Sequence, residues 1–116
     1  MRLDVRKYLF DVQDACRLLT EFSAGKTFDG YRSDVMLRSA VERQFGIVGE
    51  ALSQMLKLDP GMASALTDTR RIIAFRNMLI HGYAQVSDEV VWGILQKNLP
   101  ILRQEVEQLL SDENLP

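Results

Sequence analysis

The segment from residue 33 to residue 57 constrains the fold more than any other, because its apolar residues recur at helical spacing throughout. At 100° per residue, one apolar set shares a single helix face, and a second set widens that face to roughly 200°. The first set is Leu37, Val41, Phe45, Val48, Leu52 and Met55, and the second is Met36, Ala40, Ile47 and Ala51. A helix in a small bundle needs a narrower stripe. The sequence therefore predicts a long helix, N-capped by Ser33, that packs within its own chain and against a second copy.

Three further segments have the same helical periodicity. Residues 3–22 form the first, with a stripe of apolar positions at Val5, Leu9, Val12, Cys16 and Leu19. Another helix is predicted from a cap at Thr67 or Asp68 to His81, and the last begins after the N-cap Ser87. No segment has the alternation of a strand. The chain is therefore predicted to be all-α, an antiparallel bundle of four to five helices that pairs as a homodimer.

Glycine and proline mark the predicted interruptions. Residues 23–30 have the composition of a loop, and residues 58–61 have the chemistry of a turn. Pro100 lies within the last helical segment, but the apolar phase continues across it, which favours one kinked helix over two. The two glycines of the long helix, Gly46 and Gly49, each cost about 1 kcal/mol of helix propensity. We expect close backbone approach to explain both.

Length and composition indicate a single domain over residues 1–116. The chain is 47% hydrophobic and 26% charged, as in ordinary globular proteins, with no apolar run long enough for a membrane. We expect a cytoplasmic protein without a membrane partner, because the N-terminus also lacks a signal-peptide core. Cys16 is the only cysteine and lies in an apolar register. It is interpreted as a buried hydrophobe, and a reactive thiol is the alternative.

The net charge of −2 argues against general nucleic-acid binding. Charge is nevertheless uneven along the sequence. Residues 67–87 contain three basic residues, Arg70, Arg71 and Arg76, and a single acidic residue, Asp68. Any affinity for phosphate is therefore expected to be local to this region.

The eight residues from Arg76 to Tyr83 break the binary pattern of their helix. Arg76 projects between two apolar sets, and such contradictions tend to mark functional sites. Asn77 and His81 are four residues apart, so the amide can orient the imidazole. Gly82 can adopt a left-handed C-cap, which places His81 on the last turn, where the helix dipole favours a protonated ring. These features predict a functional site.

This octapeptide resembles the signature of the HEPN superfamily, and more narrowly of its HepT-like toxins. The resemblance extends to residues 47–51, which include Gly49 and Glu50, and to the length of the chain. It implies a metal-independent ribonuclease in which Arg76 and His81 form a site across a homodimer, the toxin of a type VII-like toxin–antitoxin pair. It also implies that a cognate nucleotidyltransferase antitoxin adenylylates Tyr83.

The residue types fit metal-free RNA cleavage. One histidine and one cysteine do not fit the ligand set of a zinc site, and no phosphate-binding loop or serine nucleophile elbow is present, so no metal or cofactor is expected. His81 is assigned to proton transfer and Arg76 to the phosphate, while Asn77 orients His81 or contacts RNA. Arg76 and His81 diverge by about 140° on an ideal helix. Because the chain has a single histidine, a mechanism with two histidines would need two chains, and this divergence points the same way.

Other interpretations remain open at this point. Arg76 could be a core arginine satisfied by a carboxylate, and His81 could simply end its helix. Glu50 could be a solvated glutamate or a pairing residue at the dimer seam. The competing function is a non-catalytic helical interaction module that docks a nucleotidyltransferase or a nucleotide.

Overall fold

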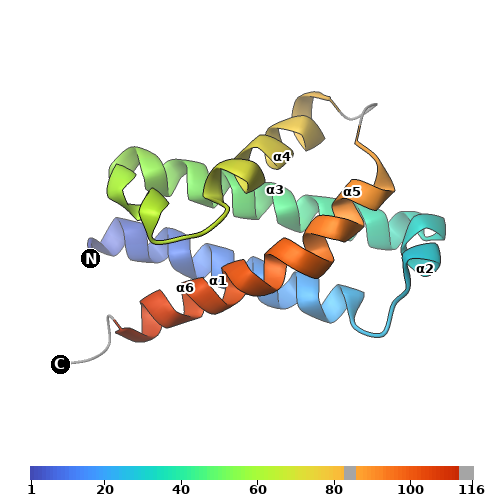
Figure 1. Ribbon diagram of the computed structural model, residues 1–116, viewed down its shortest axis with the longest axis horizontal. Helices are drawn as coiled ribbons and strands as arrows, with labels where there is room; N and C mark the ends of the chain where they lie inside the picture. Colours follow the sequence, from blue (N-terminus) through green and yellow to red (C-terminus); the bar gives the residue numbers. More distant parts are fainter. Residues whose placement is uncertain (83–85, 113–116) are drawn as a thin grey trace.

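The computed structural model of the chain, which describes residues 1–82 and 86–112, is a bundle of helices (Figure 1). The elements in chain order are α1 (Leu3–Ser23), α2 (Phe28–Ser33), α3 (Val35–Leu58), the 3-10 turn η1 (Pro60–Ser64), α4 (Thr69–His81), α5 (Asp88–Gly93), the π-helical turn η3 (Ile94–Asn98) and α6 (Leu99–Asp112). The all-α prediction is confirmed. Within residues 1–82 and 86–112, no helix is both long enough and apolar enough to cross a membrane.

The bundle is centred on α1 and α3, which run antiparallel and make the most extensive packing in the molecule (Figure 1). The last helical segment, from α5 to α6, returns alongside α1. Helix α4 packs chiefly on α3, and Figure 1 shows its C-terminal end diverging from the other long helices. One face of α4 therefore belongs to the core, through Ile72 and Phe75, while Met78 and Ile80 stay exposed.

The apolar stripe predicted for α3 is largely confirmed. Five of its six positions are buried, namely Val41, Phe45, Val48, Leu52 and Met55. The second set behaves differently: Ala51 is buried within the chain, Ile47 is half-buried, and Met36 is 81% exposed. The outer part of the arc is therefore not covered by this chain.

The predicted N-cap of α3 is wrong by one residue. The Asp34 carboxylate accepts the hydrogen bond from the backbone N–H of Leu37, at 3.1 Å. Ser33 instead ends α2, where its hydroxyl donates to the carbonyl of Asp29 at 2.8 Å. The difference arises because a short helix, α2, forms in part of the segment predicted as a loop and includes Ser33 as its last residue.

Helix α2 forms because the Thr27 hydroxyl caps it, accepting from the Gly30 N–H at 3.0 Å. Tyr31 then anchors the helix: its side chain is fully buried, with its ring centroid 5.4 Å from that of Trp92. The predicted loop is accordingly shorter, and Tyr31 fixes α2 to the bundle.

Two long-range contacts fix the beginning of α4. The Glu105 carboxylate accepts from the Thr67 backbone N–H at 3.0 Å and from the Thr67 hydroxyl at 2.5 Å. Asp68 occupies the N-cap position, as one alternative predicted, but its carboxylate accepts from the Asn98 amide at 2.8 Å. Helix α4 is thus tied at its start to the C-terminal helical segment, while its other end carries the motif.

The prediction of one helical segment across Pro100 is confirmed, with a different irregularity from the one expected. The π-helical turn η3 ends at Asn98, two residues before Pro100, and helical geometry continues on both sides of this proline. Proline supplies no N–H to the preceding turn, and a wider turn accommodates that loss. The predicted cap of this segment is also confirmed, since the Ser87 hydroxyl accepts from the Val90 N–H at 3.1 Å.

Candidate functional site

The candidate site begins where α4 crosses α3 at Gly49. A Cβ atom added to Gly49 would lie 2.3 Å from Cβ and 2.5 Å from Cγ of Arg76. The aliphatic stem of Arg76 therefore lies directly on the backbone of α3, and only glycine allows this. The predicted close approach is confirmed at Gly49. At Gly46 no described atom lies within 4 Å of such a Cβ, so this chain supplies no close approach there.

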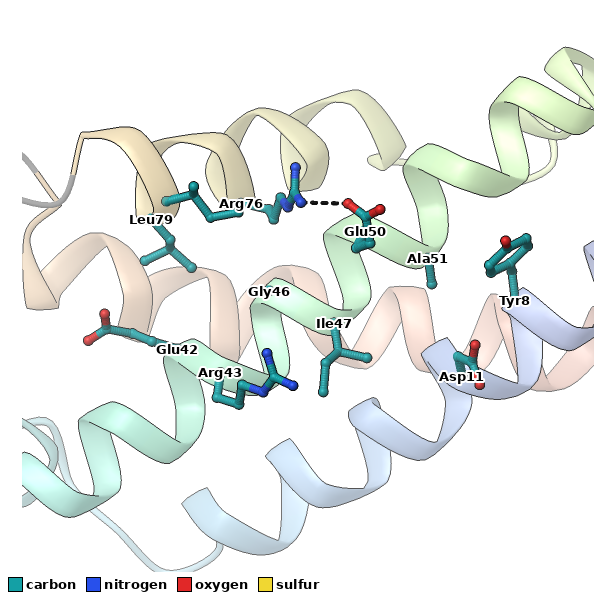
Figure 2. A pocket seen from close by; sticks show the side chains of 11 residues that line it. Tyr8, Asp11, Glu42, Arg43, Gly46, Ile47, Glu50, Ala51, Arg76 and Leu79 are labelled. Atoms are coloured by element: carbon teal, nitrogen blue, oxygen red, sulfur yellow. Dashed lines mark hydrogen bonds and ion pairs between the residues drawn. The ribbon is translucent and has the colours of Figure 1, made fainter.

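The guanidinium of Arg76 is held by the carboxylate of Glu50, as Figure 2 shows, and by the side-chain amide oxygen of Asn77. Its Nη2 donates to Oε2 of Glu50 at 2.5 Å, and its Nη1 donates to Oδ1 of Asn77 at 3.0 Å. The Arg76 side chain is 22% exposed, and its Nε is buried without a hydrogen-bond partner among the described atoms. Glu50 is thus an intrachain partner of Arg76, which neither earlier interpretation of this glutamate had specified.

An open groove of about 520 Å³ runs beside this ion pair, between α1, α3 and α4. Figure 2 shows Arg76 and Glu50 facing each other from α4 and α3, and Tyr8 and Asp11 entering from α1. The groove is lined by Tyr8, Asp11, Glu42, Arg43, Gly46, Ile47, Glu50, Ala51, Arg76, Leu79 and Ile80. The arginine predicted to bind phosphate therefore borders a solvent-accessible groove.

The other motif residues lie at the C-terminal end of α4. His81 is its last residue and is exposed. Gly82 has φ −123°, so the predicted left-handed cap is wrong; the chain leaves the helix after an ordinary bond from the Gly82 N–H to the carbonyl of Met78, at 2.8 Å. The Asn77 amide oxygen accepts from Arg76, and no hydrogen bond joins Asn77 to His81. Tyr83 lies outside the described residues.

Several titratable groups in and near the bundle core, among them Glu42 and Cys16, have raised pKa values. Burial is the main cause that raises the pKa of Glu42, with Asp88 adding to the shift and Arg38 opposing it. Burial likewise raises the pKa of the Cys16 thiol to about 12. Cys16 is fully buried, which confirms the structural interpretation and argues against a reactive thiol.

Sequence reasoning missed several residues in the groove or in contact with its lining. Gln54 donates its amide to Oε1 of Glu50 at 2.9 Å, and its spacing of four residues from Glu50 is the signal that could have found it. Tyr8 and Asp11 come from α1, and no spacing in the sequence links them to the motif. Within residues 1–82 and 86–112, no three His, Cys, Asp or Glu side chains cluster as a metal site would need.

The fold and the site together define a helical domain with an arginine–histidine motif beside a groove, and the comparisons name its family. The Ribonuclease HepT-like family matches residues 12–109, so the chain belongs to the HepT-like ribonuclease family, within the HEPN superfamily.

Several relatives match the chain over nearly all of its length, among them three from different organisms. Two are proteins named "Putative RNase": one from Caldanaerobacter subterraneus, 30% identical over 93% of this chain and 96% of its own, and one from Methanocaldococcus jannaschii, 28% identical over 90% and 94%. The third, from Thermococcus cleftensis, is named "Probable ribonuclease HepT" and is 29% identical over 94% of this chain and 98% of its own. No solved structure matches the chain.

Proposed function

We propose that this chain is a metal-independent RNA endonuclease whose active site is completed by a second copy of itself. The observation that carries the proposal is the arginine fixed at the edge of an open groove, with Arg76 seated on Gly49 and bound to Glu50. Family membership and the names of the relatives support the ribonuclease part of the proposal.

The chemistry divides between two side chains. His81 exchanges protons: as a base it takes the proton of the RNA 2′-hydroxyl, and as an acid it protonates the departing 5′-oxygen. The 2′-oxygen bonds to the adjacent phosphorus as the bond to the 5′-oxygen breaks, which leaves a cyclic phosphate and a free 5′-hydroxyl. Arg76 stabilises the charge that develops on the phosphate oxygens. No step requires a metal ion.

A dimer supplies what one chain lacks. The sequence has a single histidine, so separate acid and base histidines need two chains. The groove has room for a partner at Gly46, and Ile80 on its border is 43% exposed. Covering this apolar edge would bring a second motif to the first. We therefore place the two-fold interface along the groove.

Control of the activity rests on Tyr83, two residues beyond His81. In the proposed toxin–antitoxin pair, a cognate nucleotidyltransferase transfers AMP to the Tyr83 hydroxyl in the cytoplasm. The added phosphate is negative and bulky, so it would repel RNA from Arg76. The alternative is a non-catalytic module that docks a nucleotidyltransferase or a nucleotide, which would require neither Arg76 nor His81 to act on RNA.

The test of the activity is RNA cleavage in excess chelator. The purified protein should cleave single-stranded RNA, and Arg76→Ala or His81→Ala should lower the rate by at least about 10²-fold. A matched control is Arg103→Ala, since Arg103 also pairs with a glutamate, at 2.9 Å, and is 33% exposed. Wild-type rates in the Arg76 and His81 variants would identify a contaminating nuclease and reject the assignment.

The test of the control mechanism is intact-mass spectrometry after incubation with the partner nucleotidyltransferase and ATP. We expect wild type to gain one or more AMP groups and Tyr83→Phe to gain none, while Tyr83→Phe keeps its RNA cleavage. Equal addition to both proteins would place the modification on another residue.

A further inference from the structure

We infer that Glu50 is a positioning residue for Arg76, held in its own orientation by Gln54. The inference rests on the proposed function, because the benefit of a fixed guanidinium appears only when RNA binds. It concerns the state of the site before a substrate arrives.

The evidence begins with the carboxylate itself. Both oxygens of Glu50 have one defined partner: Oε1 accepts from Gln54 Nε2 at 2.9 Å and Oε2 accepts from Arg76 Nη2 at 2.5 Å. Gln54 is one turn further along the same helix. The carboxylate is therefore fixed on one side by its own helix and presents its other oxygen to α4.

Arg76 is restrained at two levels. Gly49 lets the aliphatic part of the Arg76 side chain lie on the α3 backbone, and the neighbouring Glu50 binds its guanidinium. Two adjacent residues of one helix thus fix both ends of this long side chain. An unrestrained arginine side chain would lose rotamer entropy when it binds a phosphate. Glu50 and Gly49 remove much of that cost in advance, which is preorganisation of the kind that catalysis uses.

The arrangement still leaves donors for RNA. A guanidinium has five N–H groups. In Arg76 one is bound to Glu50, one to Asn77, and the Nε–H is buried, so two remain for RNA. The same carboxylate carries a negative charge beside the phosphate site, however, and like charges repel. Glu50 should therefore favour the rate of the bound complex and oppose the affinity for RNA, so its two effects have opposite signs.

The experiment compares three variants at Glu50 and Gln54 in the chelator assay, separating kcat from KM. Glu50→Ala should lower kcat by about tenfold, because misplacement of a fixed group by an ångström costs up to about 10²-fold. Glu50→Gln keeps an acceptor oxygen but no charge, so it should recover kcat to within about threefold of wild type and lower KM. Gln54→Ala should lower kcat less than Glu50→Ala does.

The matched control is Glu107→Ala. Glu107 is also a helical glutamate paired with an arginine, and its side chain is 46% exposed against 48% for Glu50. It lies on α6, outside the groove. Unchanged kcat and KM in this variant would show that loss of an exposed glutamate–arginine pair alone does not impair cleavage. Sedimentation of each variant checks that the oligomeric state is unchanged.

A second readout does not depend on activity. The 15N NMR signal of the Arg76 Nε–H group, assigned by its loss in Arg76→Lys, should shift and broaden in Glu50→Ala and move less in Glu50→Gln. Equal kcat for wild type and Glu50→Ala would overturn the inference and leave the proposed ribonuclease standing. A wild-type protein that cleaves no RNA would overturn the proposed function. The NMR comparison would then still test whether Glu50 fixes the guanidinium of Arg76. An unchanged Arg76 signal in Glu50→Ala would show that it does not.

Discussion

Gly46 and Gly49 lie three residues apart on α3, yet their surroundings differ completely. At Gly49 the space that a side chain would need is filled by the stem of Arg76, from the same chain. At Gly46 that space is open and borders the groove. Both glycines weaken the helix by a similar amount, about 1 kcal/mol. The contact that explains Gly49 is present in one chain, and the contact that would explain Gly46 is not.

The difference separates two parts of the proposed active site. The α3–α4 seam around Gly49 is complete: it seats an arginine, binds it to Glu50, and needs nothing from outside. The groove around Gly46 is incomplete, with an exposed apolar border and a single chain's histidine nearby. We therefore expect substitutions at the seam to damage the folded chain itself, and substitutions in the groove to act through the second copy.

The largest effect is expected from Gly49→Ala. A methyl group 2.3 Å from Cβ of Arg76 cannot be accommodated by side-chain rotation, so α3 and α4 must separate. Overpacking costs about 1–3 kcal/mol, more than the gain of about 0.5–1 kcal/mol from replacing glycine in a helix. Denaturant unfolding should show a net loss of stability, and RNA cleavage should fall with the displacement of Arg76. A Gly49→Ala variant as stable as wild type would show that the contact between Gly49 and Arg76 does not require glycine.

A substitution at Gly46 should separate folding from assembly. Gly46→Ala meets no described atom, so the unfolding free energy of the monomeric chain should rise by about 0.5–1 kcal/mol. Gly46→Phe should leave the helical circular dichroism intact but make the protein monomeric in sedimentation, because the ring would occupy the groove. A dimeric and active Gly46→Phe protein would move the interface away from the groove.

The smallest effect concerns Glu42, which lines the groove without touching the seam. Burial raises its pKa, so the folded chain keeps this proton to a higher pH than the unfolded chain does. Stability should therefore decline as the pH rises from the ordinary glutamate range through the raised pKa. Because Glu42 is only half-buried, Glu42→Gln should raise Tm at pH 7 by on the order of 2 °C, and by less near pH 4. Thermal melts across that range test it, and a lower Tm at pH 7 would contradict the burial argument.

The helical periodicity of the sequence was sufficient to predict the fold, and local chemistry to predict some of its details. Apolar spacing placed the long helices and the buried face of α3, and Ser87 was found as a cap because capping needs only residues close in sequence. The cap of α3 was misplaced because Ser33 and Asp34 are both competent, and the choice was made by α2, which the loop composition of residues 23–30 concealed.

The site was predictable as a motif but not as an arrangement. The sequence singled out Arg76 because it contradicts its apolar stripe, and Gly49 because it weakens a helix. The sequence did not show which residues contact each other. Arg76 binds Glu50, which is 26 residues away, and Thr67 binds Glu105, which is 38 residues away. Contacts over such separations depend on how helices cross, and periodicity within one helix contains no information on that.

The central claim is that one chain is not a complete active site, and mixing two forms of the protein tests it most directly. Wild-type protein is combined with an excess of the double variant Arg76→Ala/His81→Ala, and subunit exchange is confirmed by mass spectrometry. Most wild-type chains are then paired with an inactive partner. If the site is shared between chains, RNA cleavage per wild-type chain should fall toward zero as the variant is added. Cleavage per wild-type chain that stays constant throughout the titration would show that each chain acts alone, and would contradict the account.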